Sequence, residues 1–304
     1  LTVDNGGSEV ATVIKPAAVR VFPQAVCAAA GGGHQFPFDT WAKAATNLQQ
    51  AFDAAWPGTA VLLTNGVYSN IVSPLILRRG ITVRGVNGPG QTAIQPRSGA
   101  NTRLFLVMHT NAVVEGITLR NGSWANSGMA FGGAVWLTGG TIWNCVISSN
   151  LASGLPNQPG AGGGVYMAAG LVRNCLIYRN ESRAQNSTGH GGGIYMSGGL
   201  VQNCTVVSNY AQGAFPAVSN DVTCGGGIRF EGGSITNTIV VDNGIRVVTN
   251  AGVQISLIAT NIGYSCSPDL VHNPAGTGNI TNNPEFVDAA QGDYVWFLDA
   301  DDLM

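Results

Sequence analysis

The sequence is poor in charged residues, and above all in lysine. Only 10% of its 304 residues are charged, the lysines are limited to Lys15 and Lys43, and the formal net charge is -2. Proteins that bind nucleic acid usually carry a basic stripe that neutralises phosphates. The composition therefore argues against a nucleic-acid partner.

Long apolar runs are also missing. No stretch approaches the roughly 20 apolar residues that a membrane-spanning helix needs, so we expect no membrane span. The sequence starts at Leu1 without a charged and then apolar leader. Any secretion signal is therefore expected to have been removed before this residue.

Several motifs that carry well-known chemistry are absent as well. The six cysteines form no close pair such as CxxC with a partner histidine, which a zinc site would need. No nucleotide-binding loop and no catalytic triad motif is present. These absences predict neither a zinc site nor an organic cofactor.

Glycine, in contrast, is abundant, with 43 residues, and much of it belongs to a repeat. Each copy reads as a short apolar strand, a glycine turn, a second strand that runs through Asn-Cys, and a closing Asn. The four copies are GGAVWLTGGTIWNCVISSN (Gly132 to Asn150), GGGVYMAAGLVRNCLIYRN (Gly162 to Asn180), GGGIYMSGGLVQNCTVVSN (Gly191 to Asn209) and GGGIRFEGGSITNTIVVDN (Gly225 to Asn243).

A unit this short cannot bury its own apolar face, so the copies must stack on one another. The strands are too short and too rich in β-branched residues for helical repeats. The repeat therefore predicts an all-β right-handed parallel β-helix. We expect one domain overall, with an N-terminal segment and capping helix over 1–58 and the β-helix, ending in loop-rich sequence, over 59–304.

Three cysteines occupy one position of successive repeats, namely Cys145, Cys175 and Cys204. Equivalent positions stack about 4.8 Å apart, so we interpret these residues as a ladder of buried free thiols rather than a metal site. Cys27, Cys224 and Cys266 lie outside the ladder. A disulfide between Cys224 and Cys266 is left open.

The closing asparagines suggest a second ladder. An amide side chain at a tight turn can bond the backbone of its own coil and of the next coil, which satisfies groups that the turn leaves unpaired. An earlier copy of the closing residue is expected at Asn121, after Ile117 and Leu119. The predicted ladder consists of Asn121, Asn150, Asn180, Asn209 and Asn243.

A helix is expected before the strands. Asp39 or Thr40 can cap it, and Pro57-Gly58 ends it. One face carries the apolar residues Trp41, Ala45, Leu48, Phe52 and Ala55. A solenoid has an exposed apolar end, so we expect this helix to cover the first coil.

The strand that opens each repeat gives the best clue to a functional surface. Val135 and Leu137 share one parity and should face the core, so the residue between them points outward. Rings on an outward strip suit the faces of sugars, and an arginine suits a carboxylate. The alternative is that the rings simply stack on one another and stiffen the solenoid. The equivalent outward residues are Trp136, Tyr166, Tyr195 and Arg229.

The loops after the closing asparagines carry a concentration of ionisable side chains. They leave from one corner of the solenoid and should gather beside the outward strip. Their candidate residues are Glu181, Arg183, His190 and Asp221. Glu231, two positions beyond Arg229, either contributes to substrate binding or pairs with a neighbouring arginine.

β-Elimination on an acidic polysaccharide would need a cation for the uronate carboxylate, a base for the C5 proton and an acid for the leaving oxygen. The candidates for these catalytic roles are Arg229, His190 and Tyr195, with Arg183 as a second possible cation. The candidates for substrate binding are Trp136, Tyr166, Arg183, Glu181, Asp221 and Glu231.

The segment HQFPFDTWAKAATNLQQAFDAAWPGTAVLLTNGVYS resembles the opening of secreted bacterial proteins with the pectate-lyase-like right-handed β-helix. The ending GTGNITNNPEFVDAAQGDY resembles the last coil of such proteins. The stretch Gly132 to Val135 and the Ile147 to Asn150 motif are similar to repeats of polymorphic outer-membrane adhesins. The matching residues of the opening are Trp41, Ala44, Leu48, Gln49, Ala51, Asp53, Ala54, Ala55, Gly66 and Tyr68.

The resemblance implies the fold, but it covers lyases, glycosidases, esterases and non-enzymatic surface proteins. Lyases of this superfamily use an Arg or Lys base and a calcium site built from carboxylates. No Asp and Glu cluster recurs in successive repeats here, so calcium is left open without a clear site. The Asp pairs of β-helical polygalacturonases have no clear counterpart either.

Two functions therefore compete. The first is a secreted carbohydrate-active protein that binds a polysaccharide partner, with cleavage as a lyase or glycosidase left open. The second is a non-catalytic cell-surface or adhesin scaffold. In both cases we expect an extracellular or cell-surface location and a monomer.

Overall fold

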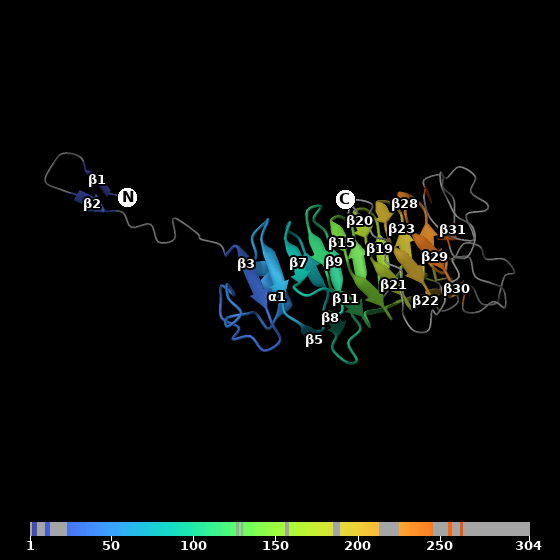
Figure 1. Cartoon of the computed structure of the whole chain (residues 1–304), viewed down its shortest axis with the longest axis horizontal. Helices are drawn as coiled ribbons and strands as arrows, with labels where there is room; N and C mark the ends of the chain where they lie inside the picture. Colours follow the sequence, from blue (N-terminus) through green and yellow to red (C-terminus); the bar gives the residue numbers. More distant parts are fainter. Residues whose placement is uncertain are drawn as a thin grey trace, which may run out of the picture.

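The chain folds into a solenoid of short parallel strands, which confirms the predicted all-β parallel β-helix. Figure 1 shows the strands following one another along the long axis of the molecule. The sequence from Gly252 onward, including the predicted loop-rich end, lies almost entirely outside the described residues. The computed structural model describes residues 2–4, 10–12, 23–125, 128, 130–155, 158–184, 189–212, 225–245, 255–256 and 262–263.

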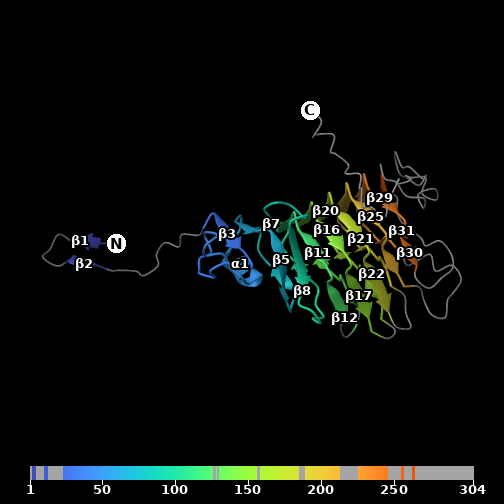
Figure 2. The same cartoon turned by 60° about the horizontal axis from the view of Figure 1, so that its bottom comes forward.

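Three long parallel sheets form the walls of the solenoid. Sheet 1 contains β3 (Ala25–Ala28), β4 (Ala60–Leu63), β7 (Thr82–Gly85), β10 (Val113–Glu115), β15 (Thr141–Trp143), β20 (Leu171–Arg173), β24 (Leu200–Gln202), β28 (Ser234–Thr236) and β32 (Ile262–Gly263). Sheet 2, visible in Figure 2, contains β5 (Gly66–Ile71), β8 (Thr92–Pro96), β11 (Thr118–Arg120), β16 (Val146–Ser148), β21 (Leu176–Tyr178), β25 (Thr205–Val207) and β29 (Ile239–Val241). Sheet 3 contains β6 (Leu75–Leu77), β9 (Phe105–Val107), β14 (Val135–Leu137), β19 (Val165–Met167), β23 (Ile194–Met196), β27 (Ile228–Phe230) and β31 (Ile255–Ser256).

A fourth sheet occupies the start of the predicted loops. Glu181 and Arg183, for example, belong to a strand rather than to a loop. The prediction of continuous loops was wrong here because the backbone pairs with the coils on either side and so satisfies its hydrogen bonds. Sheet 4 contains β12 (Ser123–Ala125), β17 (Leu151–Gly154), β22 (Glu181–Ala184), β26 (Tyr210–Ala211) and β30 (Gly244–Ile245).

Two smaller pairs complete the described strands. β13 (Ala130–Phe131) and β18 (Gly160–Ala161) form a parallel pair between sheets 4 and 3 in chain order. β1 (Thr2–Asp4) and β2 (Val10–Thr12) form an antiparallel pair. Because β3 pairs with β4, sheet 1 begins at Ala25, before residue 59, where we expected the β-helix to start.

The second strand of each repeat is interrupted at Asn-Cys, contrary to the prediction that it runs through. The asparagine adopts a left-handed conformation that turns the chain from sheet 1 into sheet 2, and asparagine tolerates this conformation better than most residues. Gly116, with φ of 64°, makes the same turn between β10 and β11. The corner residues are Asn144 (φ 50°), Asn174 (φ 52°), Asn203 (φ 51°) and Asn237 (φ 47°).

The core follows the alternation expected of the opening strands. In β14, Val135 and Leu137 are fully buried, and the corresponding pairs in β19, β23 and β27 are buried as well. The glycine runs before these strands allow close stacking. A Cβ atom on Gly133, for instance, would lie 2.2 Å from the carbonyl oxygen of Gly163.

The cysteine ladder is confirmed. Cys145, Cys175 and Cys204 are buried and free, and the Cys175 thiol donates to the carbonyl oxygen of Arg173 over 3.1 Å. Burial raises the pKa of the Cys175 thiol well above its usual value, and the neighbouring Cys145 and Cys204 thiols act in the same direction. In the next coil, Thr238 takes the thiol position and bonds the Thr236 carbonyl oxygen over 2.8 Å.

The asparagine ladder is confirmed for four of its five members. The Asn180 amide nitrogen donates to Asn209 Oδ1 over 2.9 Å and to the Ile147 carbonyl oxygen over 2.9 Å. The same pattern links Asn150 to Asn180 and Asn209 to Asn243. Asn121 was wrongly included, because it lies one residue short of the ladder position. Gly122 takes that position and donates its backbone N–H to Asn150 Oδ1 over 2.7 Å.

The predicted N-terminal helix is wrong in its first half. Helix α1 spans only Leu48–Ala54, and Asn47 caps it by accepting a hydrogen bond from the Gln50 N–H. The preceding residues form turns in which His34 N–H bonds the Ala44 carbonyl oxygen, and Trp41 is 44% exposed. Phe52 of α1 stacks on Phe105 of β9 with 6.1 Å between ring centroids. That α1 acts as the cap of the solenoid stays a prediction.

Candidate functional site

The outward strip occupies adjacent strands of sheet 3. The parallel register pairs Trp136 with Tyr166, Tyr166 with Tyr195, and Tyr195 with Arg229. All four side chains are half-buried on the outer surface of the solenoid. The sequence therefore located this strip correctly, whereas its role in binding stays a prediction.

The aromatic rings of the strip pack against one another. Tyr166 and Tyr195 are stacked with centroids 5.0 Å apart and 8° between ring planes, and Trp136 meets Tyr166 edge-on at 6.2 Å. Phe131 of β13 adds contacts to Trp136 at 5.6 Å and to Tyr166 at 4.4 Å. Ring faces that contact each other are not open to a ligand, so the strip offers ring edges and hydroxyl groups rather than the open faces that we expected.

A polar cluster lies at the Tyr195 end of the strip. The Tyr195 hydroxyl donates to Glu231 Oε2 over 2.5 Å. Arg229 donates to Glu231 Oε1 from Nε over 3.1 Å and from Nη2 over 3.0 Å. His190 lies near enough to act electrostatically on the same carboxylate. The structure thus brings together all three candidate catalytic residues, with Glu231 at their centre.

The hydrogen bonds of the cluster fix the protonation of two groups. Partial burial opposes ionisation of Glu231, but the bonds from Tyr195 and Arg229, together with the charges of Arg229 and His190, outweigh it and lower the pKa of this carboxyl. Burial, followed by the bond to Glu231 and its negative charge, raises the pKa of Tyr195 far above its usual value. At neutral pH, Tyr195 is therefore a protonated donor and Glu231 a carboxylate.

This arrangement changes what Arg229 can do. Its side chain is 14% exposed and already pairs with Glu231, whose side chain is 38% exposed. A uronate carboxylate would compete with Glu231 for the Nε and Nη2 donors of the guanidinium. Tyr195 can supply a proton to a substrate only once its bond to Glu231 is broken. The expected role of Arg229 as the cation for a substrate carboxylate stays a prediction.

The remaining candidates are not part of this cluster. Glu181 and Arg183 lie on β22 of sheet 4 and form an ion pair with each other at 3.0 Å. Asp221 lies outside the described residues, as do Cys224 and Cys266. The roles of these residues in substrate binding stay predictions.

Sequence reasoning missed a second group at the Trp136 end of the strip. The Arg103 guanidinium lies 4.0 Å from the ring centroid of Trp124 and 4.9 Å from that of Trp136. Its side chain is only 3% exposed. A signal was available, because Arg103 stands two residues before the opening strand, where the later repeats have glycine.

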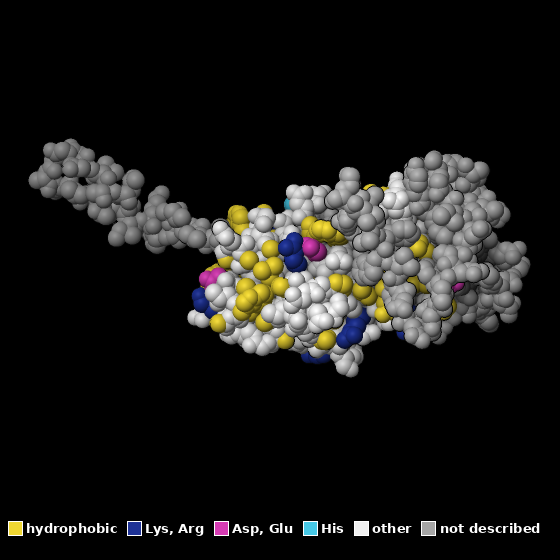
Figure 3. All heavy atoms as spheres, viewed as in Figure 1, with side chains coloured by type: hydrophobic (Ala, Val, Ile, Leu, Met, Phe, Trp, Pro, Cys, Tyr) yellow, Lys and Arg dark blue, Asp and Glu magenta, His cyan; other side chains and the backbone are white. Residues whose placement is uncertain are grey.

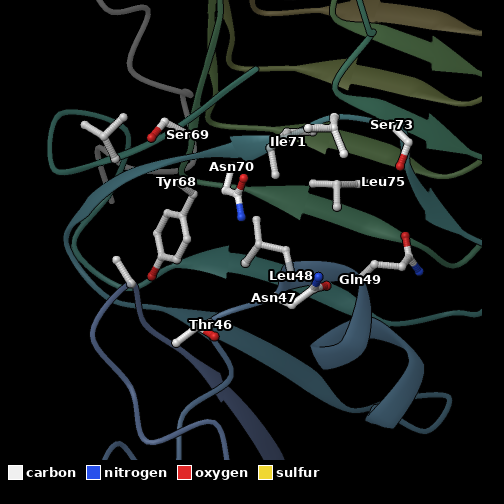
Figure 4. A pocket seen from close by; sticks show the side chains of 13 residues that line it. Thr46, Asn47, Leu48, Gln49, Tyr68, Ser69, Asn70, Ile71, Ser73 and Leu75 are labelled. Carbon is white, nitrogen blue, oxygen red and sulfur yellow. The ribbon is translucent and has the colours of Figure 1, made fainter. Parts of the chain in front are cut away.

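A cavity of about 310 Å³ lies near the N-terminal end of the solenoid, far from the strip in sequence. Figure 4 shows Tyr68 and Asn70 of β5 and Asn47 and Gln49 at the start of α1 lining it. Tyr68 bonds the Ala28 carbonyl oxygen over 2.9 Å, and Gln49 accepts a bond from the Ile76 N–H over 2.8 Å. These polar groups hold α1 and β5 in place, and no charged side chain lines the cavity.

The described part of the face in Figure 3 shows few charged side chains. On the face in Figure 3, basic and acidic side chains are scattered among polar and hydrophobic ones. Within the part of the chain that the structure describes, no three His, Cys, Asp or Glu side chains are grouped so that they could hold a metal ion. No helix among those residues is long and apolar enough to cross a membrane.

The fold and this surface define the class of protein as a parallel β-helix protein. No protein-family model and no curated protein matches the chain. Among solved structures, it is similar to pectin methylesterase PemA from Erwinia chrysanthemi, with a TM-score of 0.41 and 14% identity over 82% of this chain and 71% of that chain. Two hexasaccharide complexes of pectin methylesterase, one of them a mutant, give TM-scores of 0.40 and 0.41 at 15% identity with the same coverage.

These similarities concern the course of the backbone alone. The neighbours act on pectin, as their names state, but at this level of identity they do not transfer a site to the present chain. The expected secretion and the resemblance to adhesins stay predictions.

Proposed function

We propose that this chain is a carbohydrate-binding β-helix protein that holds a polysaccharide along the outer surface of sheet 3. The observation that carries this proposal is the continuity of the strip. Aromatic edges at Trp136 and Tyr166 lead in register to the Tyr195 and Glu231 hydrogen-bonding pair. A linear polymer matches such a row because each coil presents one side chain about 4.8 Å further along.

The chemistry of the strip suits sugars. Ring edges give apolar contact with the C–H groups of a sugar, while hydroxyl and carboxylate groups bond its hydroxyls. The Glu231 carboxylate is an accessible hydrogen-bond acceptor, because its side chain is 38% exposed. Tyr195 and Arg229 fix its orientation. Rigid, pre-oriented polar groups bind at a lower entropic cost than mobile ones.

Catalysis would take place at the polar cluster if the protein is an enzyme. Tyr195 is protonated and could donate to a leaving oxygen, and His190 is the candidate base. Because Arg229 pairs with Glu231, this scheme has no cation dedicated to the carboxylate of a uronate. The proposal is therefore binding, with lyase or glycosidase activity as a further possibility that an assay must decide.

The stacked rings also favour the second candidate, a non-catalytic scaffold. Tyr166 contacts Trp136, Tyr195 and Phe131, which is what a structural ladder requires. In that case the strip contributes stability but binds no glycan, and the solenoid serves as a rigid display or adhesin module at a cell surface.

A panel of neutral and uronate oligosaccharides distinguishes these functions. Calorimetric titration should detect binding to the wild type, and Tyr195→Ala should weaken it while the protein stays folded at the temperature of the titration. Absorbance of an unsaturated product would identify a lyase, and new reducing ends without that absorbance would identify a glycosidase. A wild type that binds no member of the panel, combined with strip variants that lose stability, would favour the scaffold.

A further inference from the structure

Arg103 has a large charged side chain at a position where the later coils have glycine. It precedes Phe105 of β9 by two residues, and the corresponding residues before β14, β19, β23 and β27 are Gly133, Gly163, Gly192 and Gly226. Trp124 on β12 is equally unusual, because its register partners are the small residues Ala152, Ser182 and Ala211. The later coils fold without either side chain, so the fold itself does not require them.

The group that these residues form contains donors without acceptors. Arg103 Nε and Nη1 are buried, and neither has a hydrogen-bond partner among the described residues. Trp136 Nε1 is also buried without a hydrogen-bond partner among these residues, and the centroid of its ring lies 4.9 Å from the guanidinium. Burying a charge or a polar donor without a partner is unfavourable, so the site lacks an acceptor that would complete it.

The charge on Arg103 persists in this environment. Burial lowers the pKa of Arg103 to about 10, which still leaves the guanidinium protonated at neutral pH. Contact with the two tryptophan rings stabilises the cation through their electron-rich faces, but it leaves the edge donors of the guanidinium unpaired. A planar fork of N–H donors matches the two oxygens of a carboxylate.

We propose that Arg103, Trp124 and Trp136 form a binding site for the carboxylate of an acidic sugar at the Trp136 end of the strip. This inference rests on the proposed glycan-binding function and specifies its substrate class as an acidic polysaccharide. Arg103 thereby takes the role that the sequence suggested for Arg229, whose guanidinium is held by Glu231.

The backbone around the site is held firmly while one ring stays accessible. Asn101 bonds the backbone of Ala125 at both its N–H and its carbonyl oxygen, and Ser123 N–H bonds the Thr102 carbonyl oxygen over 3.1 Å. Trp124 itself is half-buried and sits on the first strand of sheet 4. Because Arg103 is 3% exposed and lies 4.0 Å from the Trp124 ring centroid, the proposed site requires the Trp124 side chain to move before a carboxylate reaches the guanidinium.

The test compares an acidic ligand with its neutral form on the full chain. Trigalacturonate and its fully methyl-esterified form are titrated calorimetrically into the wild type, Arg103→Met and Arg103→Lys. Arg84→Gln is the matched control, because Arg84 lies on sheet 1, pairs with Glu115 over 2.8 Å, and loses the same charge. We expect the wild type and Arg84→Gln to bind the acid at least tenfold more tightly than the ester. Arg103→Met should bind the two equally.

The proposal is overturned if the wild type binds acid and ester equally, or if Arg103→Met keeps the preference. If Arg103→Met does not fold, Arg103→Lys decides, because it keeps the charge and loses the fork. The preference of Arg103→Lys for the acid over the ester should then be at least fivefold smaller than that of the wild type. If the wild type binds neither trisaccharide, the glycan-binding function fails, and titration with glucuronate monitored by tryptophan fluorescence tests the carboxylate site alone. A saturable change in tryptophan fluorescence that the wild type shows and Arg103→Lys lacks supports the site. No fluorescence change in the wild type overturns it.

Discussion

The Tyr195 hydroxyl donates a 2.5 Å hydrogen bond to Glu231 Oε2, while Arg229 holds the other carboxylate oxygen. Tyr195 belongs to β23, and Glu231 follows β27 of the next coil. The bond therefore ties neighbouring coils together on the outer surface of sheet 3. It also leaves the carboxylate ionised and fixed in orientation, which a binding or catalytic group requires.

This pair predicts a two-sided dependence of stability on pH. The folded-state pKa of Glu231 is lowered, so its contribution is present above the unfolded pKa of about 4.3 and is lost as pH falls through the folded value. The folded-state pKa of Tyr195 is raised, so its contribution is present below about 10 and is lost as pH rises through the folded value.

Denaturant unfolding of wild type, Tyr195→Phe, Glu231→Gln and the double variant measures this coupling. We expect a coupling free energy of about 1 kcal/mol at pH 7 that fades toward pH 3. Absorbance titration at alkaline pH should show a late-ionising tyrosine component that is lost in Tyr195→Phe. A coupling near zero at pH 7 would show that the hydrogen bond is absent in solution.

The cysteine ladder predicts a strong difference between apolar and charged substitutions. Cys175→Asp places a carboxylate among buried thiols and should cost several kcal/mol or prevent folding. Cys175→Ala and Cys175→Val should cost about 1–3 kcal/mol. Thiol titration of the native protein checks burial directly, and rapid labelling of Cys145, Cys175 and Cys204 before unfolding would contradict it.

The asparagine ladder predicts that Asn180 is critical for stability. Its amide bonds two acceptors, and its Oδ1 accepts from the backbone N–H and the side chain of Asn150. Asn180→Ala leaves these buried groups unpaired, and we expect a loss of about 2–4 kcal/mol in unfolding free energy. Asn121→Gly is the control, because Asn121 is exposed with φ of 59°, where glycine fits without strain. Similar losses in both variants would argue against the ladder.

The helix α1 predicts a packing contribution at the N-terminal end. Phe52 is buried against Phe105, so Phe52→Ala should cost about 3–5 kcal/mol and promote aggregation by exposing apolar surface. Trp41→Ala, in the exposed turns before α1, should cost less than about 1 kcal/mol. Thermal melts with light scattering compare the two, and equal behaviour would mean that α1 does not protect the end of the solenoid.

The fold could be predicted because its repeat specifies local geometry at every coil. Alternation around Val135 and Leu137 identified the core face and the outward strip, and the recurring cysteine identified the thiol ladder. The corner at Asn144 could not be recognised from apolar pattern, because asparagine in a left-handed turn and asparagine in a strand leave the same sequence pattern. Asn121 was misplaced for a related reason, since only the register shows that Gly122 aligns with the ladder.

The site could be predicted only in part. One residue per coil on a single face follows from parity, so the sequence locates the strip and its Arg229, and pairing with an arginine is one of the two roles that it leaves open for Glu231. The contacts of Phe131 and Trp124 depend on segments between repeats, whose paths no periodicity specifies. Arg103 lies outside the repeated strand, so the alternation that locates the strip does not extend to it.

Oligosaccharide binding to the strip variants tests the central claim most directly. Calorimetric titration of the best-binding glycan should give a dissociation constant at least fivefold weaker for Tyr166→Ala and for Tyr195→Ala than for the wild type, which corresponds to about 1 kcal/mol. Trp143→Ala, which removes a ring that is 40% exposed on sheet 1, should bind like the wild type. Unchanged binding in both tyrosine variants, or a loss confined to Trp143→Ala, would contradict a glycan site on the outer surface of sheet 3.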